Sequence, residues 1–264
     1  MMEHIVPIRP WNIRQGGRRL LKQLGLLEAA KSIWVHAIPE RQLFSQFIKR
    51  GSLVFDVGAN VGHYTWKYEK LGAHVVAIEP QTENFQKLVE EFGHNKNVML
   101  VNQGLDEKPG TRELIVGATD SVFSTMSPEF MRAVIQSGHA STARWGQSRH
   151  VPVTTLDLLI EEFGLPDFIK IDVEGFEYQV LKGLTRPIQT LSFEFRSEYI
   201  QSTLNCIAHL SHLGNYEFNY TPKFSYKLAL PMWLDSKNIA ERLGQASRQP
   251  HSRLAGDIYV RFVN

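Results

Sequence analysis

The sequence contains very little cysteine and no long apolar run. Its 264 residues include one cysteine, Cys206, which excludes an internal disulfide and any metal site built from several cysteines. No uncharged apolar segment approaches the ~20 residues that a helix needs to span a bilayer. The first residues also lack the apolar core of a secretory signal peptide. We therefore expect a protein without a transmembrane segment, in a reducing, cytoplasmic setting.

Net charge is small as well. The chain carries a formal charge of +2, which argues against a protein that binds polyanions over its whole surface. The charge is uneven, because residues 1–22 hold five lysines and arginines against one acid, Glu3. This basic arm is either a solvated helix face or a contact for phosphates or a membrane surface.

The sequence divides into an N-terminal helical appendage, residues 1–50, and one larger domain, residues 51–264. In the appendage, apolar residues follow loose helical stripes over 18–34 and 43–48, and the first stripe is a candidate for covering a cleft or for self-association. From residue 51 onward, short apolar runs alternate with helical stripes. This alternation predicts an α/β domain with a doubly wound, mostly parallel sheet.

The expected strands and the expected loop follow from the same pattern. A long loop is expected at residues 117–150, which are rich in Ser, Thr, Gly and His, and a loop of that length is usually functional. Strands are expected at residues 53–57, 74–78, 98–101, 168–171, 191–195, 216–220 and 258–262.

The strongest motif runs from the first strand through a glycine turn into a helix. Asp56 ends the strand, and Gly58, Asn60 and Gly62 follow it. Glycine lets a ligand lie against the backbone, and the helix N-terminus offers free N–H groups to an anionic group. A charged Asp56 in an apolar run suggests a cationic or hydrogen-bonding partner. The alternative is a tight turn in which Asp56 caps backbone amides.

A second signal is Glu79-Pro80 at the end of the second strand. Glu79 lies about 20 residues after the glycines, where Rossmann-like domains bind the hydroxyls of an adenosine ribose. The spacing also fits a nicotinamide dehydrogenase. However, the glycines form G-x-x-x-G without the middle glycine that a pyrophosphate needs, and Asp56 would repel that pyrophosphate.

A third signal is the pair of acids after the strand at residues 168–171. Asp172 and Glu174 flank a turn that contains Gly175. Ligands of open α/β sheets bind beyond the carboxyl ends of the strands, so these acids are expected beside Asp56 and Glu79. Clustered acids can bind a cation, orient a hydroxyl or act as a general base.

Together these motifs resemble a known family, the FkbM family of methyltransferases. The resemblance is carried by residues 54–65, Glu79-Pro80, Asn102-Gln103-Gly104, and residues 153–157 and 169–183. It implies a class I methyltransferase fold, a Rossmann-like domain whose seven-stranded, mostly parallel sheet has an antiparallel last strand. It also implies S-adenosylmethionine as cofactor and O-methyl transfer to a hydroxyl of a sugar, glycan or secondary metabolite.

The resemblance also implies roles for particular residues. Asp56 and Gly58 would line the methionine end of the cofactor, Glu79 would bind the ribose, and residues 102–104 would face the adenine. The implied cofactor-binding residues are Asp56, Gly58, Asn60, Gly62, Glu79, Pro80, Asn102, Gln103, Gly104 and Asp172.

Methyl transfer requires an acceptor oxygen in line with the methyl group and a group that removes the proton. Asp172 and Glu174 are the first candidates for that base, and His63 is another. Asp172 and Glu174 could hold a metal, because carboxylates suit Mg²⁺, but no sequence feature requires one, so we assign no metal ligand. On this interpretation, the loop at residues 117–150 closes over a small-molecule or glycan acceptor.

Three other functions remain open at this point. The basic arm favours a nucleic-acid methyltransferase, but no core stripe of basic and aromatic residues supports it. A non-catalytic nucleotide-fold module would not depend on Asp56, Glu79, Asp172 or Glu174. A dehydrogenase would bind NAD.

Overall fold

The computed structural model describes residues 39–117, 124–138, 145–223, 225–249 and 254–263. The basic arm at residues 1–22 and the expected helix at residues 18–34 lie outside these ranges. In the described part of the chain, no helix is long and apolar enough to cross a lipid bilayer.

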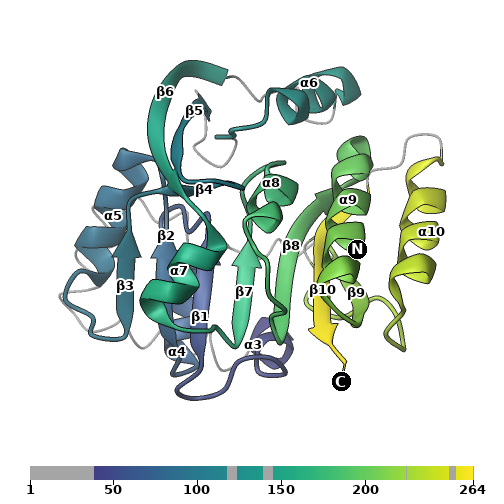
Figure 1. Ribbon diagram of the computed structural model, residues 1–264, viewed down its shortest axis with the longest axis horizontal. Coiled ribbons are helices and arrows are strands. Elements are labelled where there is room, and N and C mark those ends of the chain that lie inside the picture. The colour runs from purple at the N-terminus through teal and green to yellow at the C-terminus, as the bar shows by residue number, and fades with distance from the viewer. Residues whose placement is uncertain (1–38, 118–123, 139–144, 224, 250–253, 264) are drawn as a thin grey trace, which may run out of the picture.

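A seven-stranded sheet forms the centre of the molecule (Figure 1). From one edge to the other, its strands are β3 (Val98–Val101), β2 (His74–Ile78), β1 (Leu53–Val57), β7 (Phe168–Ile171), β8 (Thr190–Arg196), β10 (Ala255–Phe262) and β9 (Tyr216–Pro222). Neighbours from β3 to β8 pair in parallel, whereas β10 runs antiparallel to both β8 and β9. The predicted class I methyltransferase fold, with its antiparallel last strand, is confirmed.

Helices cover both faces of this sheet, because its central strands are apolar on both sides. One face packs against four helices: α7 (Leu156–Phe163), α8 (Glu177–Lys182), α9 (Ile200–Leu213) and α10 (Ser236–Ser247). The other face packs against α3 (Pro39–Phe44), α4 (His63–Lys70) and α5 (Thr82–Phe92). A short 3₁₀ helix, η3 (Ser197–Tyr199), joins β8 to α9.

The described part of the predicted appendage packs tightly onto the larger domain. Leu43, Phe44 and Ile48 are buried in a cluster with strand residues of β1, β7 and β10. Glu40 of α3 also forms an ion pair with Lys67 of α4. The division at residue 50 stays a prediction, but α3 contributes directly to the core on this face.

The expectation of a long loop at residues 117–150 is wrong over most of its described length. Helix α6 (Pro128–Ser137) and the start of β6 (Trp145–Thr154) lie in this region. Strand β6 joins β4 (Gly104–Leu105) and β5 (Gly110–Gly117) in a small sheet of order β4-β6-β5. Helix α6 begins at a local signal, since the Ser127 side chain accepts a hydrogen bond from the Phe130 amide and Pro128 follows it. Strand β6 forms by pairing with β5, and no local sequence pattern predicts this pairing.

The small sheet and α6 lie beyond the carboxyl ends of β1, β2 and β7 (Figure 1). This edge is where ligands of open α/β sheets bind. The insertion between β3 and α7 therefore overhangs the edge at which the predicted site residues gather.

Candidate functional site

The turn between β1 and α4 is built from three residues in the left-handed region. Gly58, Asn60 and Gly62 have φ angles of 81°, 51° and 84°. A Cβ on Gly58 would lie 1.9 Å from the Asp172 carbonyl oxygen, and one on Gly62 would lie 2.4 Å from the Phe92 ring. Both glycines are thus required by the packing of the protein itself, in addition to any approach of a ligand.

Glu79 connects this turn to the end of β2. Its carboxylate accepts hydrogen bonds from the backbone amides of Asn60 and Gln81, both at 2.8 Å. Burial raises the pKa of Glu79 to about 7, although these two hydrogen bonds favour the charged form. The Asn102 side chain donates to the Glu79 carbonyl at 2.8 Å and to the Pro80 carbonyl at 3.4 Å. The structure therefore brings Asn60, Glu79, Pro80 and Asn102 together.

Asp56 lies deeper, with only 1% of its surface exposed. It accepts a hydrogen bond of 2.5 Å from the Thr65 hydroxyl of α4 and pairs in register with Lys170 of β7. Burial raises the pKa of Asp56 to about 6, against the effect of Thr65 and Lys170. The partners that the structure shows for this acid are internal, and contact with a ligand stays a prediction.

Lys170 is a buried cation at the centre of the sheet. Its Nζ contacts Asp172 at 3.1 Å and Asp257 at 2.9 Å, and lies 4.8 Å from the centre of the Tyr64 ring. Burial alone would lower the pKa of Lys170, but the two carboxylates raise it well above its ordinary value. Lys170 therefore stays charged and fixes the Asp172 side chain.

The turn after β7 holds the second group of acids. Glu174 has a φ of 52°, which is uncommon for a residue with a side chain. The Thr125 hydroxyl donates to its carbonyl at 2.6 Å. Glu177, buried at the start of α8, accepts hydrogen bonds from the amides of Val173 and Gly175 at 3.3 and 3.1 Å. These contacts hold the turn in place from both sides.

Three carboxylates meet beyond this turn. One oxygen each from Asp172, Glu174 and Glu194 lies within 4.8 Å of the other two. Burial and the neighbouring acids raise the pKa of Glu174 well above its ordinary value and that of Glu194 to about 8. We call these three residues the carboxylate cluster.

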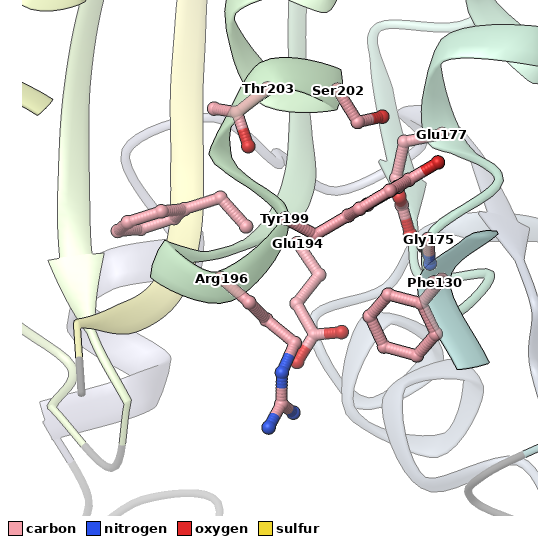
Figure 2. Close-up of a pocket in the computed structure, with 9 residues that line it drawn as sticks. Phe130, Gly175, Glu177, Glu194, Arg196, Tyr199, Ser202 and Thr203 are labelled. Atoms are coloured by element: carbon pink, nitrogen blue, oxygen red, sulfur yellow. Dashed lines mark hydrogen bonds between the residues drawn. The ribbon is translucent and has the colours of Figure 1, made fainter. Parts of the chain in front are cut away.

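A small pocket adjoins the cluster on its β8 side. Figure 2 shows the Glu194 carboxylate between the side chains of Arg196 and Phe130, with Tyr199 nearby. The Arg196 guanidinium lies 5.9 Å from the centre of the Phe130 ring and donates to Glu198 at 2.8 Å. The remaining lining residues are Gly175, Glu177, Phe195, Ser202 and Thr203.

The overhanging insertion contacts both halves of this edge. Ser124 donates to the Gln81 side chain at 2.9 Å, next to Glu79, and Thr125 contacts Glu174. Phe130 packs so closely on Gly175 that a Cβ there would lie 2.3 Å from its ring. The segment from Ser124 to Phe130 thus spans from the Glu79 side to the carboxylate cluster.

The other predicted residues lie around this centre. Gly104 is buried in β4, with the Met126 side chain 3.1 Å from the position of a Cβ, and Gln103 is half-buried just before it. His63 begins α4, where its Nε2 lies 2.6 Å from Lys67 Nζ. His63 is not part of the carboxylate cluster.

Sequence reasoning missed Glu194, Thr125 and Arg196 as site residues. Glu194 is a single acid in the apolar strand Leu191–Phe195, which is the signal that singled out Asp56. Thr125 and Arg196 carry no comparable local signal, because tertiary packing alone brings them to this edge.

Comparison with known proteins identifies the family of the chain. Residues 56–223 match the methyltransferase FkbM domain family. The hexuronic acid methyltransferase AglP of Haloferax volcanii is 26% identical over 154 residues. That match covers 58% of this chain and 58% of the relative, so this chain spans little more than half the length of the relative.

Solved structures of similar shape share little sequence with this chain. A TehB-like methyltransferase from Corynebacterium glutamicum has a TM-score of 0.45 and 11% identity, covering 92% of this chain and 99% of that one. A precorrin-6y C5,15-methyltransferase from Geobacter metallireducens has a TM-score of 0.43 and 11% identity, covering 84% and 87%. The family match spans most of the chain and includes the glycine turn, Glu79 and the carboxylate cluster, so the protein belongs to the FkbM family of methyltransferases.

Proposed function

We propose that this protein transfers a methyl group from S-adenosylmethionine to a hydroxyl of a sugar or glycan, or of a secondary metabolite. The observation that carries the proposal is the buried Glu79 carboxylate beside the glycine turn, at the carboxyl ends of β1 and β2. A carboxylate at this place binds the ribose hydroxyls of a nucleoside in Rossmann-like domains. The similarity to a hexuronic acid methyltransferase supports a sugar acceptor.

The residues at this edge fit such a cofactor. Each Glu79 oxygen accepts one backbone N–H and retains a lone pair for a ribose hydroxyl. The amides at the start of α4 suit a carboxylate, and the acids around Asp172 suit a cationic group. Asn102 holds the Glu79–Pro80 backbone, so its amide positions the acid.

Bound S-adenosylmethionine would supply an electrophilic methyl group on a positively charged sulfur. The chain's own residues must then orient an acceptor hydroxyl and remove its proton. The proton of the acceptor hydroxyl would pass to a carboxylate of this chain as the methyl group is transferred. Asp172 and Glu174 remain the proposed bases, and Glu194 joins them because it faces the pocket.

Calorimetric titration of the purified chain with S-adenosylmethionine, S-adenosylhomocysteine and NAD tests the cofactor. We expect the first two to bind and NAD not to bind. The acceptor is tested separately by transfer of a labelled methyl group to a panel of hexuronic acids, neutral sugars and oligonucleotides. Binding of NAD alone, or methylation of the oligonucleotide alone, would contradict the proposal.

A further inference from the structure

We propose that the carboxylate cluster, Asp172, Glu174 and Glu194, binds a divalent metal ion of the hard, oxygen-preferring kind. Each residue offers one carboxylate oxygen, and the three oxygens lie within 4.8 Å of one another. Oxygens bound to one Mg²⁺ or Ca²⁺ ion lie about 3–5 Å apart, since each is ~2.0–2.6 Å from the metal. The spacing therefore matches that of ligands shared by one ion.

An unsatisfied oxygen points to the same conclusion independently. Oε2 of Glu174 is buried and has no hydrogen-bond partner in the described part of the chain. A buried acceptor without a partner is destabilising, and more so when it is charged. The left-handed backbone of Glu174 and its contact with Thr125 hold the residue in this position. A bound cation would satisfy the oxygen.

The acids of the cluster have few cationic side chains in direct contact. Lys170 is shared between Asp172 and Asp257, so it balances only one of them. Lys223 is 3.8 Å from Glu194, and Arg196, which forms an ion pair with Glu198, also attracts Glu194 and Glu174. Burial and the repulsion between the charged acids of the cluster thus raise the pKa of Glu174, and a divalent cation held between these acids would relieve that repulsion.

The donor chemistry selects the class of metal. All three donors are carboxylate oxygens, which suit Mg²⁺, Mn²⁺ and Ca²⁺ rather than metals that prefer sulfur or imidazole. One oxygen of each residue would bind the ion, so the second oxygen stays available for a proton, and three protein ligands leave coordination positions open for water or another oxygen ligand. Because Glu194 also lines the pocket, those positions lie beside it, and that an acceptor oxygen fills one of them rests on the proposed function.

The site is tested with Mn²⁺ alone, because its electron paramagnetic resonance signal decreases when the free ion becomes bound. We expect the full chain to bind one Mn²⁺ saturably, with competition by Mg²⁺ or Ca²⁺. Glu194→Gln should weaken binding roughly tenfold or more, as loss of one ligand does at a site with few protein ligands. Glu217→Gln is the matched control and should leave binding unchanged, because Glu217 lies on the edge strand β9 and pairs with Arg261 of β10.

The alternative outcomes are distinct. Absence of saturable Mn²⁺ binding, or equal binding by the wild type and a folded Glu194→Gln variant, would overturn the inference. If Glu194→Gln does not fold, Glu174→Gln replaces it, with circular dichroism as the check on both. Titration with S-adenosylhomocysteine in metal-free buffer tests the proposed function separately, so either proposal can fail while the other stands.

Discussion

At the scale of single residues, Gly58 shows how closely the turn after β1 approaches the end of β7. Its φ of 81° disfavours any side chain, and a Cβ would lie 1.9 Å from a backbone oxygen that cannot move freely. Gly58→Ala should therefore reduce the free energy of unfolding by about 3 kcal/mol or more, measured by urea denaturation. Gly110→Ala is the matched control, because no atom lies within 4 Å of its Cβ position. Equal stability of the two variants would contradict the structure.

Glu79 allows a prediction about binding and pH. The pKa of its carboxyl is about 7 in the free protein, and ribose hydroxyls would donate to the charged form. Below pH 7, cofactor binding should therefore release a proton and weaken about tenfold per pH unit. Glu79→Gln should bind S-adenosylhomocysteine more weakly and without this dependence. Glu90→Gln should behave like the wild type, because Glu90 is exposed on α5, the helix that follows Glu79 in the chain. Cofactor binding that still depends on pH in Glu79→Gln would refute the assignment.

At the scale of elements, Phe130 and Val134 are the buried residues of α6, and Phe130 packs against the candidate site. Phe130 is 1% exposed and packs on Gly175, Arg196 and Tyr199. Phe130→Ala should reduce the free energy that holds α6 against the rest of the protein by about 3–5 kcal/mol, because the substitution leaves a cavity. Hydrogen exchange should then quicken in α6 and remain slow in α9. Ile135→Ala on the same helix should change neither, since Ile135 is 58% exposed; unaltered exchange in Phe130→Ala would show that α6 is held by other contacts.

At the scale of the whole molecule, buried acids make stability depend on pH. Burial raises the pKa of Asp56 from 3.8 to about 6. When the pKa of an acid is higher in the folded than in the unfolded protein, its contribution to stability is complete below the unfolded-state pKa. The contribution is lost as the pH rises through the folded-state pKa. For Asp56 this amounts to about 3 kcal/mol at most, lost between about pH 4 and 6. The stability of Asp56→Asn should fall less steeply over this range in urea denaturation, whereas an unchanged slope would mean that Asp56 is not buried as described.

The sequence by itself determined the elements whose signals are local. The apolar runs of β1, β2 and β7 lie next to the glycine turn, Glu79 and Asp172, so one short segment shows both the element and its candidate site residue. These elements also imply the parallel sheet, because short strands alternating with helices have few other ways to pack. The fold and the side of the site around Glu79 were predictable for this reason.

Only the tertiary structure decided how the site is completed. Glu194 joins Asp172 and Glu174 because β8 pairs beside β7, and Lys170 meets Asp257 because β10 returns between β8 and β9. The small sheet arises from pairing between β5 and β6, which places Thr125 and Phe130 over the carboxyl edge. Such contacts join residues far apart in the chain, and their register depends on packing that no local pattern contains.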